Sequence, residues 1–189
     1  MEKEKRAFIA IAINKELQQE LAGIQKTLQK KITGTISWVK PENIHLTLRF
    51  LGHVTDEQLK DIRKIIDGIA KDCKNFNIDM GALGAFPDIV NPHVLWVGIQ
   101  SGFNELNRIN AQLEENLEKI NFGTGEKYFH PHLTIARIKH LDDKTALKSF
   151  AEQIRPHRAF SVVDRIVLFQ SILKPEGAHY SKIHEALLK

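Results

Sequence analysis

The sequence predicts an α+β fold of two pseudo-symmetric lobes, each a mainly antiparallel sheet with helices on its outer face, and a cleft between the lobes. Strand-like and helix-like segments are mixed without the strict alternation of a parallel, doubly wound sheet. The second half also repeats the order of the first: a helix, a strand, a strand with a His-x-Thr phrase, a helix and another strand. This repetition indicates that the halves contribute similar units.

The first half opens with a strand and a helix. The run from Phe8 to Ile13 is rich in β-branched and aromatic residues, which is typical of a strand. Asn14 can cap the next helix, because apolar residues recur there at spacings of three and four. The apolar positions of this helix are Leu17, Leu21, Ile24 and Leu28.

Two further strands and a second helix continue the first half. Residues 36–39 and 44–52 are predicted strands, and the turn-forming residues 40–43 separate them. Thr55 with Gln58 is a capping-box pattern, which predicts the start of a helix. The apolar positions of that helix are Leu59, Ile62, Ile65, Ile66 and Ile69.

The next predicted elements are two strands around a turn, at 76–83 and 94–99. A third helix comes next, with its apolar positions at Leu106, Ile109, Leu113, Leu117 and Ile120. The remaining predicted elements are a strand over 130–138, a helix from about 142 to 153, and two terminal strands over 160–171 and 179–185. Together these segments account for both halves of the predicted repeat.

Composition and length fit one globular unit. The chain has 189 residues, and no segment is rich enough in Gly, Pro or Ser to serve as a linker, so we expect a single domain over 1–189. Its net charge of +4 favours anionic partners but does not establish nucleic-acid binding. The single cysteine, Cys73, fits a reducing compartment. Because no apolar stretch matches a secretory signal or a membrane span, we expect a soluble, cytoplasmic monomer.

The most informative feature is a phrase that occurs twice, as His45-Leu-Thr47-Leu and as His132-Leu-Thr134-Ile. Residues two apart on a strand share a face, so each phrase presents an imidazole beside a hydroxyl. One copy of so short a pattern would be weak evidence, but two copies in matching contexts are strong. If the two faces are opposed across the cleft, two imidazoles flank one pocket.

Two imidazoles in one pocket suit acid–base catalysis. Near neutral pH one ring can be neutral and the other protonated, so one can activate a water while the other protonates a leaving oxygen. The threonine hydroxyls can donate to the non-bridging oxygens of an anionic group. A phosphodiester fits this arrangement, because its displacement needs groups on opposite sides and stabilisation of the charge between them.

The residues around both phrases resemble the two-histidine (2H) phosphoesterase superfamily. Within it, the RNA 2′,3′-cyclic phosphodiesterases, also called LigT-like proteins or 2′-5′ RNA ligases, are the most similar branch. The resemblance rests on the segments 38–52 and 129–137, together with 168–171 and 177–180, so it runs over essentially the whole chain. It implies a metal-independent enzyme without a cofactor, acting on RNA with 2′,3′-cyclic phosphate ends, tRNA fragments included, or on small cyclic nucleotides.

The resemblance also implies roles for residues. His45 would donate a proton to the departing ribose 3′-oxygen, and His132 would accept one from water, which leaves a 2′-phosphomonoester. Phe50 would stack on the terminal base and Arg137 would hold the phosphate. Strand parity places both away from the pocket unless a bulge or a strong twist comes after each threonine, whereas Arg49 has the parity of the pocket face and is a second phosphate candidate.

His130 shares the face of His132 and is a further candidate lining residue. A metal pair formed by these two histidines is disfavoured, because no carboxylate or cysteine lies near them in sequence. We also expect the tryptophans Trp38 and Trp96 to belong to the core.

Two other functions remain open. The cleft could belong to a nucleotide- or RNA-binding module without catalysis, although a pure binder has no need of two proton-transfer groups. The same histidines could also join a 5′-hydroxyl end to a cyclic phosphate, as a reversible 2′-5′ RNA ligase. A basic set that could track an RNA backbone is better explained as scattered solvated charge; it comprises Lys26, Lys30, Lys31, Arg155, His157 and Arg158.

Overall fold

The structure is a computed structural model, and it describes residues 4–125, 128–153, 159–174 and 177–189. The basic residues at 155, 157 and 158 lie outside the described residues. The elements, in chain order, are β1 (Lys5–Ala12), α1 (Lys15–Gln29), β2 (Gly34–Trp38), a 3-10 turn η1 (Pro41–Asn43), β3 (His45–Val54), α2 (Asp56–Lys71), β4 (Phe76–Phe86), β5 (Val94–Ser101), α3 (Phe103–Lys119), β6 (His132–Leu141), α4 (Lys144–Gln153), β7 (Phe160–Val163), β8 (Arg165–Lys174) and β9 (Gly177–Leu187).

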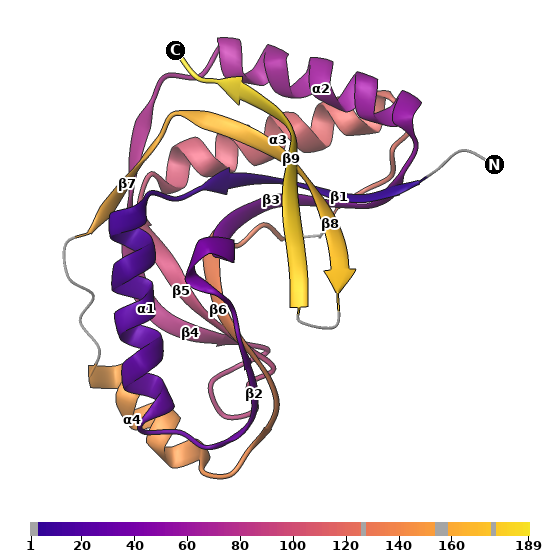
Figure 1. Cartoon of the computed structure of the whole chain (residues 1–189). Helices are drawn as coiled ribbons and strands as arrows, with labels where there is room; N and C mark the ends of the chain where they lie inside the picture. Colours follow the sequence, from indigo (N-terminus) through magenta and orange to yellow (C-terminus); the bar gives the residue numbers. More distant parts are fainter. Residues whose placement is uncertain (1–3, 126–127, 154–158, 175–176) are drawn as a thin grey trace.

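The strands form a curled antiparallel sheet that is divided into two lobes (Figure 1). One lobe has the order β3-β1-β8-β9, and the other has β6-β5-β4-β7 with β2 paired to the end of β6 beyond its contact with β3. The lobes meet where β3 pairs with β6, at Leu46 opposite Leu133. The predicted α+β architecture of two lobes is therefore confirmed.

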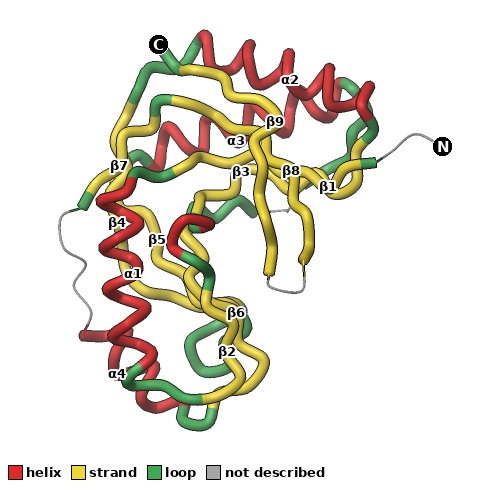
Figure 2. Tube along the Cα trace, viewed as in Figure 1, coloured by secondary structure: helices red, strands yellow, loops and turns green. Residues whose placement is uncertain are grey.

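Each lobe is assembled from both halves of the chain. Strand β4 belongs to the first half but pairs with β5, and β8 belongs to the second half but pairs with β1. The helices cross in the same way, since α3 packs on α2 and β3, whereas α1 packs near η1 and β7 (Figures 1 and 2). The lobes are thus not the two halves of the sequence.

This exchange explains one wrong prediction. The sequence predicts one strand over 160–171, but the structure has β7 and β8 with Asp164 between them. Strand β7 pairs with β4 in one lobe and β8 pairs with β1 in the other, so the chain must leave the first ladder before it joins the second. A break between the two strands allows this change of partner.

The helix starts agree with the sequence signals. The Asn14 side chain accepts from the backbone N–H of Leu17 at 2.9 Å. Thr55 and Gln58 form the predicted capping box, with each side chain bonded to the other residue's backbone N–H. The apolar side of each of these helices packs into the core, where the buried helical residues are Leu17, Leu21, Ile24, Leu28, Leu59, Ile62, Ile66 and Ile69.

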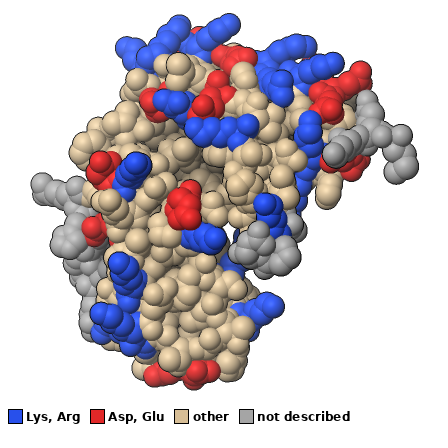
Figure 3. All heavy atoms as spheres, viewed as in Figure 1, with Lys and Arg blue, Asp and Glu red and all other residues tan. Residues whose placement is uncertain are grey.

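The surface carries mixed charge. On the face shown in Figure 3, acidic side chains lie among the basic ones rather than leaving a continuous basic surface. Among the described residues, no helix is both long and apolar enough to cross a bilayer.

We expect the chain to unfold in one cooperative transition, because each lobe depends on strands and a helix from the other half of the sequence. Calorimetry should give equal calorimetric and van't Hoff enthalpies. Leu113→Ala removes a fully buried side chain of α3 and should cost about 2–5 kcal/mol of stability. It should lower the midpoint of the whole transition, and two separable transitions would contradict this expectation.

Candidate active site

The two His-x-Thr phrases lie side by side at the junction of the lobes. Because Leu46 on β3 is paired with Leu133 on the antiparallel β6, the register sets His45 towards Thr134 and His132 towards Thr47. Both leucines are fully buried, and the four polar residues occupy the opposite face. The phrases therefore share one face of one sheet instead of facing each other from two separate sheets.

A β-bulge lies directly after each threonine. On β3, Thr47 pairs with Ala10 and Arg49 with Ile9, so Leu48 is an extra residue in the ladder. The same irregularity occurs on β6, where Ile135 is the extra residue. A bulge, one of the two distortions that strand parity allowed after each threonine, is thus present in each lobe.

The bulges place Phe50 and Arg137 on the pocket face. The β1 partners of Thr47 and Phe50 are two residues apart, and so are the β5 partners of Thr134 and Arg137. Residues whose partners on the neighbouring strand are two apart lie on the same face of the sheet. Each bulge therefore reverses the alternation of side chains for the residues that come after it. Both side chains are exposed, and Phe50 keeps 54% of its surface accessible.

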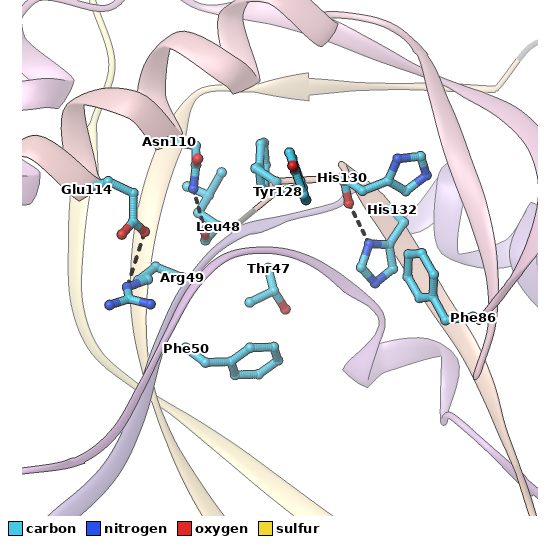
Figure 4. Close-up of a pocket in the computed structure, with 11 residues that line it drawn as sticks. Thr47, Leu48, Arg49, Phe50, Phe86, Asn110, Glu114, Tyr128, His130 and His132 are labelled. Carbon is cyan, nitrogen blue, oxygen red and sulfur yellow. Dashed lines mark hydrogen bonds and ion pairs between the residues drawn. The ribbon is translucent and has the colours of Figure 1, made fainter. Parts of the chain in front are cut away.

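The parity argument for Arg49 is wrong for the same reason. Since Leu48 is an extra residue, Arg49 turns to the face opposite Thr47. There its guanidinium forms an ion pair with Glu114 of α3 at 3.2 Å and donates to the carbonyl of Gly123 at 3.0 Å. Figure 4 shows this pair at one end of the cavity, away from the histidines. Its guanidinium is thus already engaged by protein groups.

Both histidine rings are held in the same way. Nδ1 of His45 lies 2.7 Å from the carbonyl oxygen of Asn43, and Nδ1 of His132 lies 2.6 Å from that of His130. A carbonyl oxygen only accepts, so each Nδ1 carries the hydrogen and Nε2 is the position that gains or loses a proton. The structure thus supplies two imidazoles with the same tautomer and the same backbone support.

The surroundings of His45 are aromatic. Its ring stacks on Phe8 with a centroid separation of 4.7 Å and meets the edge of Tyr180 at 5.3 Å, with Phe169 slightly farther away. Burial among these groups lowers the pKa of His45 from 6.5 to about 4; the bond to Asn43 opposes this shift, and the charge of His132 adds to it. His45 is therefore neutral near pH 7 when the cleft holds no anion.

The other histidine has different neighbours. The ring of Phe86 on β4 meets His132 edge-on at 5.1 Å, and Trp96 on β5 lies 4.7 Å from His130. A Cβ atom at Gly84 would collide with the Trp96 ring, so this glycine lets the indole lie flat on β4. Trp96 is thus half-buried beside the site, rather than a purely core residue as predicted.

Two adjoining cavities share Thr47 and Phe50. One has a volume of about 380 Å³ and is bordered by His130 and His132 (Figure 4). The other, of about 440 Å³, contains His45. Thr134 and Arg137 also line this second cavity. The predicted site residues are therefore brought together in one cleft, with Arg49 at its margin.

Some lining residues carried no clear sequence signal. Phe8 and Phe86 are strand aromatics whose spacing marks only a core position, and Tyr180 reaches His45 from the last strand. Among the described residues, no cluster of three or more His, Cys, Asp or Glu side chains could hold a metal ion.

The sequence matches the family model described as LigT-like phosphoesterase twice, over residues 11–96 and 97–180. The chain belongs to the LigT-like phosphoesterase family. The division falls within β5, the counterpart of β1 in the second half, and so agrees with the repeat seen in the fold.

Several relatives of this LigT-like chain are similar over nearly its full length. An RNA 2′,3′-cyclic phosphodiesterase from Aquifex aeolicus is 35% identical over 97% of both chains. One from Methanocaldococcus jannaschii is 34% identical over 95% of this chain and 99% of its own. Escherichia coli LigT, solved as a complex with 3′-AMP, has the same fold, with a TM-score of 0.81 at 20% identity over 99% of each chain.

We expect the His45 ring of this LigT-like protein to stay neutral as the pH falls from 7 and to take up its proton only near pH 4. Its Cε1 chemical shift, tracked by NMR and identified with His45→Gln, would report the midpoint. Because folding lowers this pKa below that of the unfolded chain, the free energy of unfolding should decline as the pH falls from 6.5 towards 4. A midpoint near 6.5 would contradict the burial that we describe.

Proposed function

We propose that this chain is an RNA 2′,3′-cyclic phosphodiesterase, which hydrolyses a terminal 2′,3′-cyclic phosphate to a 2′-phosphomonoester. The observation that carries the proposal is the pair of His45 and His132 in one cleft, each with Nδ1 donating to a backbone carbonyl, which makes Nε2 the nitrogen that exchanges the proton. The full-length relatives that bear the name of this activity support it.

The reaction needs one proton taken and one given. A water oxygen attacks phosphorus while Nε2 of His132 accepts a proton from that water. The bond between phosphorus and the ribose 3′-oxygen breaks, and Nε2 of His45 donates its proton to that oxygen. The products are a 2′-phosphomonoester and a 3′-hydroxyl, and the ring protons return to their starting state through solvent.

The donor role requires that His45 be protonated when substrate is bound. Its pKa of about 4 in the free cleft is unfavourable for that form near neutral pH. An anionic phosphodiester beside the ring stabilises the imidazolium and raises the pKa. We therefore expect His45 to take up a proton from solvent when the anionic substrate binds beside its ring.

The remaining lining residues suit the rest of the substrate. The hydroxyls of Thr47 and Thr134 flank the position between the histidines and can donate to the non-bridging phosphate oxygens. Arg137 presents an exposed guanidinium from the same face, which matches a phosphate in two-point geometry. Phe50 offers an exposed ring on which a base of any identity can stack.

Two further residues have narrower roles. His130 contributes its carbonyl to hold His132, and its ring packs against Trp96, so it supports the site as well as lining it. Arg49 acts at most indirectly, because Glu114 already neutralises its guanidinium.

The substrates would be RNA ends with cyclic phosphates, tRNA fragments among them, or small cyclic nucleotides. We place the enzyme in the cytoplasm as a monomer, since its one cysteine, Cys73, is buried without a disulfide partner and one chain lines the whole described cleft.

His45→Ala and His132→Ala should each reduce turnover by about 10²–10⁴-fold, because each removes a positioned proton-transfer group. The assay is conversion of a short RNA with a 2′,3′-cyclic phosphate end in EDTA, with the 2′-phosphate and 3′-phosphate products resolved. His140→Ala, which changes an exposed histidine of the same strand β6, is the matched control. An active double variant, or activity that EDTA removes and added metal restores, would defeat the mechanism.

Replacing Arg137 should mainly change kcat, whereas replacing Phe50 should mainly change KM. Arg137→Ala should lower kcat by about 10²–10³-fold, because charge develops on the phosphoryl oxygens in the transition state. Phe50→Ala should mainly raise KM, since stacking worth about 1–3 kcal/mol is present before and during the reaction. Steady-state kinetics with the exposed controls Lys139→Ala and Phe160→Ala would show whether these assignments are reversed.

A further inference from the structure

Each bulge beside the active site is held by a side-chain amide from a helix. The extra residue on β3 is Leu48, and its carbonyl accepts from Nδ2 of Asn110 on α3 at 2.9 Å. The extra residue on β6 is Ile135, and its carbonyl accepts from Nε2 of Gln25 on α1 at 2.8 Å. Figure 4 shows Asn110 directed at Leu48 above the cavity.

These two bonds are counterparts in the repeat. Helix α1 comes after β1 and helix α3 after β5, and β1 and β5 are matching strands of the two halves. Each helix crosses to the lobe that contains the other half's motif strand. Gln25 of the first half thus holds the bulge of the second, and Asn110 of the second half holds the bulge of the first.

Gln25 is an unusual residue for its position. It is only 4% exposed and lies among the apolar residues that α1 directs into the core. Its Nε2 also donates to the carbonyl of Val39 at 2.7 Å, while the N–H of Val39 donates to Ile135. A buried polar side chain is tolerated only with its hydrogen bonds made, and both hydrogens of this amide are used.

Each side-chain amide adds a donor to a bulge carbonyl. An extra residue disrupts the ladder locally, so a bond to its buried carbonyl favours the bulged register. At Ile135 the Gln25 amide acts together with the N–H of Val39, which donates to the same carbonyl at 2.9 Å. A one-residue change of register would turn Arg137 or Phe50 to the opposite face, as the position of Arg49 already illustrates. The helix amides therefore favour the register that the cleft needs.

We infer that Gln25 and Asn110 are positioning residues for the reaction, with Gln25 orienting Arg137 towards the phosphate and Asn110 orienting Phe50 towards the base. This inference rests on the proposed function. It predicts that the two residues, which lie on different helices and are matched in the repeat, act on different kinetic constants.

The test uses near-isosteric variants that lack the donor. Gln25→Met should lower kcat by roughly 10- to 100-fold with little change in KM, because a misplacement of about 1 Å can cost that much. Asn110→Leu should raise KM by about 3- to 10-fold with little change in kcat, a fraction of the full stacking contribution. Gln29→Met on α1 and Asn107→Leu on α3 are the matched controls: Gln29 is exposed, and the Asn107 amide donates to Phe103 of its own helix.

Double-mutant cycles separate positioning from general destabilisation. In an Arg137→Ala background, Gln25→Met should lower kcat by less than about twofold. In a Phe50→Ala background, Asn110→Leu should raise KM by less than about twofold. The crossed pairs should be additive. Equal losses in all backgrounds, or the same losses in the controls, would overturn the inference, and so would a direct substrate contact by Asn110 that is additive with Phe50→Ala.

Two outcomes need a readout other than activity. If Gln25→Met does not fold, the partly exposed Asn110 decides the inference through its own cycle. If the wild type does not hydrolyse a cyclic phosphate, the proposed function fails separately. Crystal structures of both variants then decide: a bulge displaced from Leu48 or Ile135 supports positioning, and bulges unchanged with Phe50 and Arg137 still in the cleft overturn it.

Discussion

The pairing of Leu46 with Leu133 is the contact on which the site depends. Among the described residues, this pair joins strand β3 of one lobe to strand β6 of the other, and both side chains are fully buried. Because side chains alternate across a strand, the burial of these leucines turns the flanking histidines and threonines to the open face. The antiparallel direction then sets each histidine towards the other phrase's threonine, and the lobes diverge from there to leave a cleft.

A symmetrical frame holds two chemically different imidazoles. Both rings have the same backbone acceptor two residues earlier, so their tautomers agree. Their neighbours differ, since Phe8, Phe169 and Tyr180 surround His45, and Phe86 and Trp96 lie beside His132. Desolvation disfavours the imidazolium form at His45. The two imidazoles therefore have surroundings that the repeat does not share, and in the proposed reaction the bound anion offsets this desolvation at His45.

Local signals predicted most elements, because they depend on neighbours in sequence. The Asn14 cap and the Thr55–Gln58 capping box are read within one helical turn. The failures have distant causes. The break at Asp164 exists because β7 and β8 pair with strands in different lobes, and Arg49 faces Glu114 because a bulge precedes it. No local pattern contains either partner.

The sequence by itself determined the chemistry that is available: two His-x-Thr phrases, the aromatic and the guanidinium that come after them, and a repeated order of elements. The alternation of side chains along a strand was enough to show that a bulge or a strong twist must come after each threonine if Phe50 and Arg137 are to reach the cleft. Only the tertiary structure decided that the bulges exist, and each bulge carbonyl accepts from an amide donor on a helix far away in the chain. It also decided the exchange of strands between the lobes, since pairing energy comes from contacts that no single segment makes alone.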